Sequence, residues 1–185
     1  MLDPYIPGTT VKFTDNDDSF ALFKNMINVT NGLHLNQICQ ITDLQTSTIQ
    51  NWVKRGYVPH PVNKKYYDRH LARILLISSL RECMKIEDIG ELMFLINGDA
   101  DDISDDIVSE EALFNYFALA IKRLDLNSIT PEGIDSTLSN ILAEANARHR
   151  RELLQAIKVM IYSFISLKCQ NQVDACLEKL KKLKH

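Results

Sequence analysis

The side chains best suited to chemistry in this sequence lie on one short segment, residues 46–55. Its outward positions carry Ser47, Thr48, Gln50, Asn51, Lys54 and Arg55. Hydroxyl and amide groups of this kind read base edges when a helix enters a major groove, and cations hold phosphates. Ile49, Trp52 and Val53 give the same segment an apolar inward face, and Thr46 is expected to cap it. The segment therefore predicts a helix that binds nucleic acid.

A second amphipathic segment comes directly before it, with Leu35, Ile38 and Ile41 at helical spacing. Thr42-Asp43-Leu44 separates the two segments, and Asp tolerates the positive φ that a tight turn requires. A turn of this length packs two helices at a steep angle. The pattern is that of a helix-turn-helix.

Residues 57–67 follow Gly56 and are too rich in proline and β-branched residues to continue the helix. We interpret them as a small wing, followed by a helix that opens at Asp68 and a further helix over residues 86–96. The expected DNA-contacting side chains are Thr46, Ser47, Thr48, Gln50, Asn51, Lys54, Arg55, Lys64, Lys65, Tyr66 and Arg69.

These segments resemble the MerR family of bacterial transcription regulators. TSTIQNWVKRGYV is similar to that family's recognition helix, KKYYDRHLARI to its wing and third helix, and CMKIEDIGELMFLI to its fourth helix. PVNKKYYDRHLARILLISSL resembles more closely an uncharacterised bacterial branch, known as a numbered domain of unknown function. Gln50 stands where MerR proteins commonly carry Arg, and Lys64 stands at the wing Arg. The resemblance implies a mainly all-α protein: a MerR-like winged helix-turn-helix followed by a helical C-terminal region.

Charge is sorted along the chain, although the formal net charge is only −3. Residues 33–85 hold eight Lys and Arg against three Asp and Glu, residues 86–145 hold two against fourteen, and residues 146–185 hold nine against three. A local excess of cations is what phosphate contact requires. We expect an N-terminal arm with a short helix at 1–32, a DNA-binding domain at 33–97 and a helical dimerisation or regulatory region at 98–185.

The segment 97–111 carries seven acidic residues and no cation. It lacks the glycine and closing glutamate of a calcium loop, so we interpret it as a solvated linker. Ser109 is expected to cap a helix reaching Asp125 that is apolar on most faces and therefore buried, in a core or in a subunit interface.

Thr130 and Pro131 begin the longest helical pattern, which reaches about residue 168. Such a helix is too long for a small domain to cover, so the pattern implies a partner chain or a kink. The apolar pattern is interrupted at residues 148–151, where the sequence is RHRR. We interpret these residues as a solvated face or a bend, with a second phosphate-contacting patch as the alternative. A separate final helix is expected over residues 172–183.

The four cysteines form no CxxC pair, which agrees with a reducing compartment. Cys39 and Cys83 fall among expected core positions. Cys169 and Cys176 can share a helix face, and a redox or soft-metal role for them in a dimer is the less favoured alternative. No phosphate loop, nucleophile motif or metal-ligand pair indicates an enzyme or a cofactor.

No apolar run is long enough to span a membrane, and the N-terminus does not look like a signal peptide. We therefore expect a cytoplasmic, sequence-specific transcription regulator that binds double-stranded DNA as a homodimer on a palindromic site. The alternative is a winged helix that docks onto another protein without binding DNA.

Overall fold

The fold is organised around one buried helix, α4 (Asp68–Leu80). The computed structural model describes residues 5–125 and 129–183, and in these ranges it contains eight helices and no strand. The other helices are α1 (Ala21–Thr30), α2 (Leu35–Thr42), α3 (Thr46–Lys54), α5 (Ile86–Asn97), α6 (Glu110–Arg123), α7 (Pro131–Glu144) and α8 (Arg150–Lys182). The expectation of a mainly α protein is confirmed.

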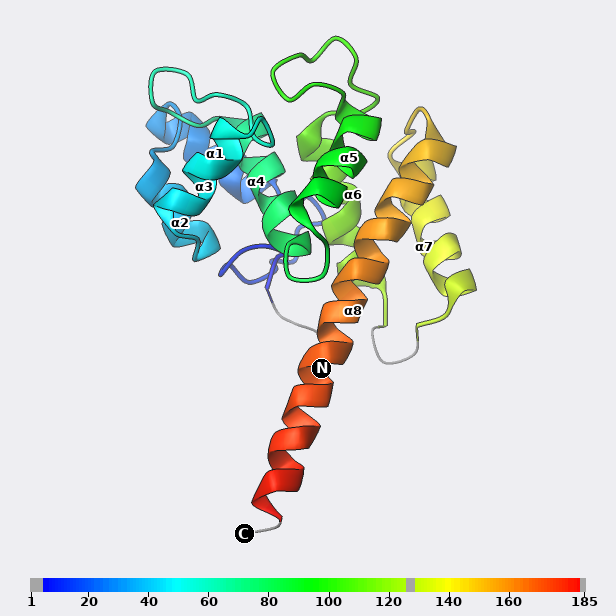
Figure 1. The fold of residues 1–185 in the computed structure, drawn as a ribbon. Helices are drawn as coiled ribbons and strands as arrows, with labels where there is room; N and C mark the ends of the chain where they lie inside the picture. Colours follow the sequence, from blue (N-terminus) through cyan, green and yellow to red (C-terminus); the bar gives the residue numbers. More distant parts are fainter. Residues whose placement is uncertain (1–4, 126–128, 184–185) are drawn as a thin grey trace.

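Figure 1 shows α1, α2 and α3 on one side of α4, and α6, α7 and α8 on the other. α4 contacts α1, α2, α5, α6 and α8, and ten of its thirteen residues are buried because other helices surround it. The hydrophobic core is one continuous cluster that runs from Ile6 to Phe164. The cluster contains residues from both sides of residue 97, the expected domain boundary. The two halves of the chain therefore share a single core.

The expected helix caps have mixed outcomes. The Ser109 hydroxyl accepts a hydrogen bond from the Ala112 backbone N at 3.3 Å, and the Thr130 hydroxyl accepts one from the Gly133 N at 3.0 Å. The cap expected at Thr46 is wrong, because Gln45 occupies the N-cap position and Thr46 is already helical. The burial expected for the helix after Ser109 is explained by the core itself, since α6 packs against α4, α7 and α8.

The long helix expected over residues 130–168 is broken between α7 and α8, and residues 148–151 at the break are exposed, as the interpretation of a solvated face or a bend predicted. Asn146 and His149 both adopt φ of 49°, and the chain reverses there so that α7 and α8 pack against each other. Asparagine is one of the few residues that tolerates this left-handed conformation. The separate final helix expected at 172–183 is also wrong, because α8 continues without interruption to Lys182.

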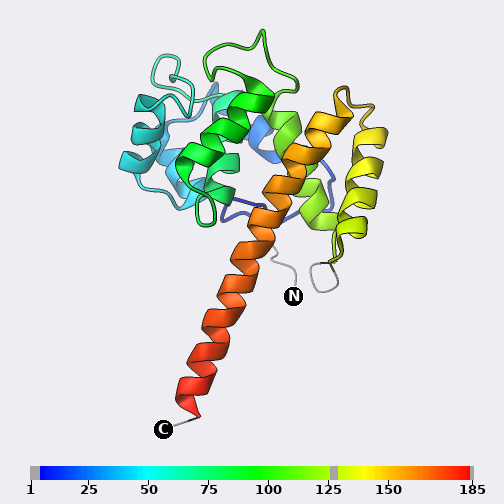
Figure 2. The same cartoon turned by 45° about the vertical axis from the view of Figure 1, so that its right-hand side comes forward.

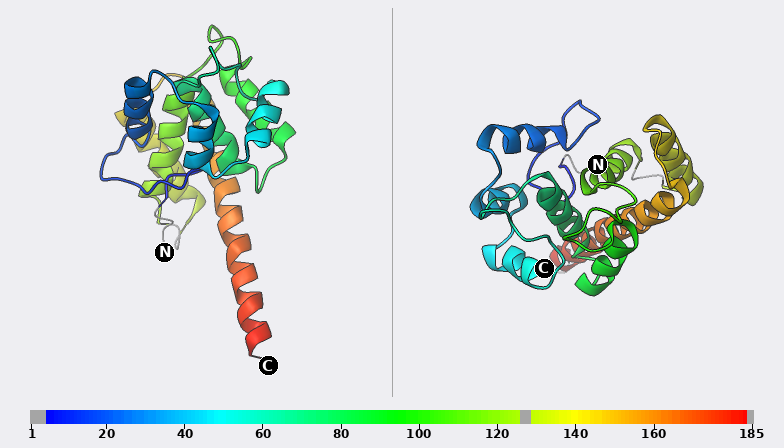
Figure 3. Two further views of the ribbon diagram at one scale, coloured as in Figure 1. Left: turned by 90° about the vertical axis from the view of Figure 1, so that its left-hand side faces the viewer. Right: turned by 90° about the horizontal axis from the view of Figure 1, so that it is seen from above.

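The C-terminal half of α8 projects from the rest of the molecule as a straight stalk (Figures 1 and 2). Figure 3, seen from above, shows α7 at the edge of the molecule, where it packs against α6 and α8. Of the cysteines expected in the core, Cys39 is half-buried but Cys83 is exposed on the α4–α5 connection. None of the helices in the described ranges has an apolar stretch that could cross a bilayer.

Candidate nucleic-acid interface

The turn between α2 and α3 holds α3 at the surface. Asp43 adopts φ of 56°, the left-handed conformation expected for it. Leu44 inserts into the core directly after this residue, and Ile49 and Trp52 anchor the inner face of α3. Buried side chains on both sides of the turn leave α3 little freedom to rotate, so its outer face is fixed.

The outer face of α3 is available for contact. Ser47, Gln50, Asn51 and Lys54 are exposed and Thr48 is half-buried. Within the described residues, the side chains of Gln50, Asn51 and Lys54 make no hydrogen bond or ion pair. The structure therefore brings these predicted contact residues together on one unoccupied polar surface.

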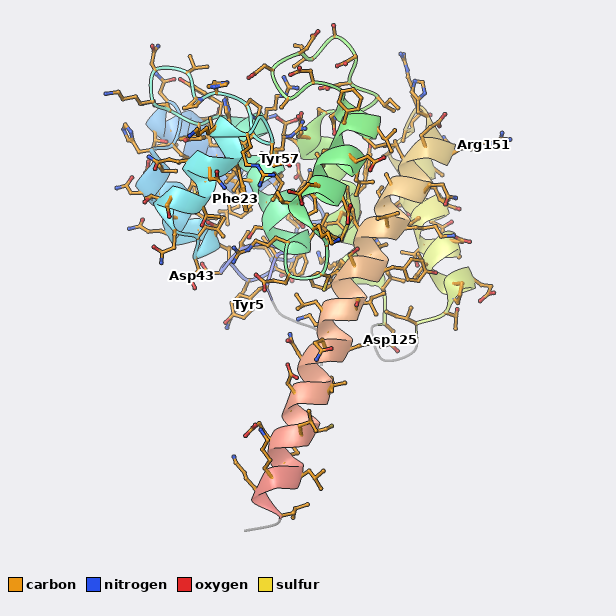
Figure 4. All side chains as sticks on the ribbon, viewed as in Figure 1. Tyr5, Phe23, Asp43, Tyr57, Asp125 and Arg151 are labelled. Atoms are coloured by element: carbon orange, nitrogen blue, oxygen red, sulfur yellow. The ribbon has the colours of Figure 1, made fainter. Side chains whose placement is uncertain are left out.

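Arg55, just after α3, is already paired. Its Nη2 donates to Glu87 Oε1 on α5 at 2.7 Å and to the Tyr57 hydroxyl at 3.0 Å, and its guanidinium lies 4.8 Å from the centre of the Tyr57 ring. The hydrogen bond from Arg55 lowers the pKa of Glu87. Figure 4 shows Tyr57 between α3 and α5. Both charged side chains remain partly exposed, so a phosphate could replace Glu87 at little cost.

The expected wing is reduced to a two-residue turn. Asn63 and Lys64 adopt φ of 52° and 62°, and Val62 and Lys65 exchange both backbone hydrogen bonds at 3.0 Å. Two successive residues with positive φ between one bridged pair define the turn of a minimal β-hairpin. A wing with strands is not confirmed, but this turn carries the exposed side chain of Lys64 to its tip.

Two of the residues expected to hold phosphates have structural roles instead. Lys65 Nζ donates to the carbonyl oxygens of Thr30 and Asn31 at 3.0 and 2.7 Å, where α1 ends. A cation at a helix C-terminus satisfies carbonyls that have no partner within the helix. The Tyr66 side chain is 4% exposed and lies edge-on to the His70 ring, so it is part of the core.

Arg69 belongs to an ion-pair cluster and does not lie on the open surface. Its Nε donates to Glu110 Oε1 at 2.9 Å, and its Nη2 donates to the Asp102 carbonyl at 2.8 Å and lies 3.7 Å from Asp106 Oδ1. Arg73 Nη1 donates to the same Glu110 oxygen at 3.0 Å. Four charged side chains therefore tie the acidic segment to α4.

Sequence reasoning missed Arg73 and Glu110 as partners. Arg73 is a cation inside the buried stretch 70–77 of α4, four residues after Arg69 and on the same face. That position was the available signal, because a charge within a buried run needs an ionic partner. Desolvation lowers the pKa of Arg73, and the negative charge of Glu110 opposes that shift.

The acidic segment is more than a solvated linker. Asp101 accepts hydrogen bonds from the His60 backbone N and lies 3.1 Å from His60 Nδ1, so the segment lies across the loop that follows α3. Desolvation, followed by repulsion from Glu110, raises the pKa of Asp106 to about 6. With Glu87 and Glu91 of α5, the segment lines an open cleft of about 470 Å³ that Arg55 and Tyr57 border. The polar face of α3 thus has a negatively charged neighbour on its α5 side.

The fold and this surface define the chain as an all-helical protein in which a helix–turn–helix pair presents one polar helix face. The chain belongs to the family described as domain of unknown function DUF1836, whose model matches residues 21–117. That range holds α1 to α5, the acidic segment and the first half of α6, whereas α7 and α8 lie beyond it.

A curated relative is similar over part of its length. The chain is 29% identical over 128 residues to the uncharacterized protein YkrK of Bacillus subtilis (strain 168), a match that covers 66% of this chain and 54% of the relative. The chain therefore spans about half the length of that relative. No solved structure matches the chain. The resemblance to MerR regulators stays a prediction.

Proposed function

We propose that the protein is a sequence-specific regulator that binds duplex DNA as a homodimer, with α3 in the major groove. The observation that carries the proposal is the outer face of α3, where Ser47, Gln50, Asn51 and Lys54 are exposed on a helix that the core holds in place. Amide groups pair with adenine edges in two hydrogen bonds, and lysine neutralises a phosphate. The role that we propose is binding and not catalysis. We also propose that the protein acts in the cytoplasm.

The contact set that we propose is smaller than the sequence alone predicted. Ser47, Thr48, Gln50 and Asn51 would meet bases, while Lys54, Arg55 and Lys64 would meet phosphates. Lys65, Tyr66 and Arg69 are left out because their side chains cap α1, fill the core and pair with Glu110. Thr46 stays in the set as an exposed residue at the start of α3.

The test is selection of bound fragments from a random duplex library at two salt concentrations. We expect a palindromic sequence whose enrichment falls as salt rises, because phosphate contacts release counterions. Asn51→Ala should relax the base preference at one position of each half-site while leaving the salt dependence unchanged. Absence of any enrichment at low salt, from folded protein, would reject the proposal.

The second candidate function is docking onto another protein. The pairing of Arg55 with Glu87 and the acidic segment beside α3 favour it, since both reduce the positive potential that draws DNA. Its affinity would not involve the release of counterions from phosphates, so it would change less with salt than DNA binding does. The salt dependence of the affinity of α3 for its partner therefore distinguishes DNA binding from protein docking.

A further inference from the structure

The outward face of α8 carries apolar side chains that no other part of the described structure covers. Inward-facing residues are buried only as far as Phe164, and residues 169–183 are exposed throughout. On this projecting half, Val173 is 51% and Leu180 53% exposed, and they border a shallow apolar groove with Cys176 and Leu177. Most of the stability of a helix in a protein comes from packing of its apolar face, and this half of α8 packs on nothing in the described structure, so a partner surface would stabilise it.

The spacing of these residues is that of a helix–helix seam. Cys169, Val173, Cys176, Leu180 and Leu183 follow one another at alternating steps of four and three residues. The same alternation extends back onto the body through Ser166, Tyr162 and Val159, all of which are exposed. Apolar residues that repeat every 3.5 residues on average form a stripe that stays in contact with a partner helix in a left-handed coiled coil. On a straight helix that packs on a flat surface, the apolar residues would repeat every 3.6 residues.

The charges of the stalk lie away from this seam. Asp174, Glu178, Lys181 and Lys182 all fall at positions remote from it on the helix wheel. The flanking positions are Gln170, Gln172, Leu177 and Lys179, of which one is charged. A different partner chain is normally selected by charges at flanking positions, and these are nearly neutral. Two identical stalks can therefore pack with little like-charge repulsion.

We propose that this stripe, from Val159 to Leu183, is the surface on which a second copy of the chain docks as a two-helix coiled coil. This pairing rests on the homodimer part of the proposed function and not on DNA binding. Dimerisation through α8 and DNA binding through α3 can therefore be tested, and rejected, independently. Both copies use the same stripe, and the contact is closed by two-fold symmetry.

The first test measures the molar mass of the full chain by sedimentation equilibrium in the absence of DNA. We expect a dimer at tens of micromolar for the wild type, and a monomer for Val173→Glu with Leu180→Glu, which puts charges into the seam. The matched control is Asn171→Glu with Ala175→Glu, which adds the same charge on the outer side of the same helix and should leave the dimer intact. A monomeric wild type, or a dimeric seam variant, would overturn the proposal.

A second test uses the cysteines that the chain already carries. Cys169 and Cys176 lie on the seam, whereas Cys83 is exposed on the α4–α5 connection. Alkylation of Cys169 and Cys176 should slow severalfold as protein concentration rises, while the rate at Cys83 stays constant. Equal rates at all concentrations would contradict the pairing. Binding to anionic lipid vesicles by a chain that stays monomeric would assign the stripe to a membrane surface instead, because lysines surround its end.

Discussion

Arg73 and Glu110 form an ion pair that is almost completely removed from solvent, with side chains 4% and 1% exposed and Nη1 lying 3.0 Å from Oε1. The same carboxylate oxygen also accepts from Arg69 at 2.9 Å. The pair joins the middle of α4 to the first residue of α6 and fixes the path of the acidic segment between α5 and α6.

Removing the carboxylate should therefore be costly. Glu110→Ala leaves Arg73 buried without a counter-charge, and we expect a loss of about 3–5 kcal/mol in the free energy of unfolding. Urea denaturation at neutral pH measures it. Glu87→Ala is the control, because it breaks the exposed pair with Arg55 and should leave the midpoint nearly unchanged. If both substitutions lowered the free energy of unfolding equally, burial of the Arg73–Glu110 pair would contribute nothing beyond what an exposed pair contributes.

Asp106 gives the fold a pH dependence of unusual sign. Burial raises the pKa of Asp106 from 3.8 to about 6, so the folded state holds its proton more tightly than the unfolded chain does. The stabilisation from that proton is complete below about pH 4 and is lost as the pH rises to about 6.

Asp106→Asn should therefore stabilise the protein at pH 7. The gain over the wild type should grow between about pH 4 and pH 6 and stay constant above it, since no further proton is released. Denaturation midpoints of both proteins at several pH values test this. A gain that does not vary with pH would mean that the substitution acts through packing or through the 3.7 Å contact with Arg69.

Gly90 permits close packing of the loop after α3 against α5. A Cβ atom at this position would lie 2.5 Å from Cε1 of Tyr57, closer than two carbon atoms approach in van der Waals contact. We expect Gly90→Ala to destabilise the wild type by about 1–3 kcal/mol, as overpacking usually does.

A double-mutant cycle isolates that contact. In a Tyr57→Ala background the same substitution meets no ring, and alanine then favours the helix over glycine by about 0.5–1 kcal/mol. The sign of the effect should reverse between the two backgrounds. Additive effects would place the cost of Gly90→Ala elsewhere in α5.

The sequence predicted the local structure of residues 33–97 well, because apolar spacing and turn residues there are local signals. The helices that begin at Leu35, Asp68 and Ile86 and the left-handed turn at Asp43 all follow the expected pattern. The break between α7 and α8 was left open between a bend and a solvated face, since a lapse in an apolar seam allows both.

Side-chain roles could not be predicted in the same way, because they depend on partners distant in sequence. Lys65 and Arg69 have the residue types of phosphate contacts, and only the packing shows that one caps α1 and the other pairs with Glu110. Likewise, nothing local to residues 97–111 indicated that this segment would lie against α4 and the loop after α3.

The proposed phosphate contacts are best tested on Lys54 and Lys64, which are exposed and carry no structural role that the structure shows. Lys54→Ala with Lys64→Ala should weaken binding to all duplexes and reduce the slope of log affinity against log salt by about 3.6, because the dimer loses two phosphate contacts in each of its two half-sites at roughly 0.9 each. Lys181→Ala with Lys182→Ala removes the same charge from the distant stalk and should leave the slope unchanged. Identical losses for both pairs would point to non-specific attraction by net charge.

Arg55 offers the sharpest test of whether α3 faces DNA. In the free protein Glu87 holds its guanidinium at 2.7 Å, so a phosphate must compete with a carboxylate for the same fork of donors. Glu87→Gln removes that competitor while keeping the shape of the side chain, and we expect tighter binding of duplex DNA, severalfold at low salt, with a salt slope steeper by about one phosphate in each half-site. Because the change also takes one negative charge from the protein, Glu178→Gln on the stalk serves as the matched control. If both variants bind DNA alike, Arg55 does not meet the duplex, and the docking of a protein partner becomes the better account of this surface.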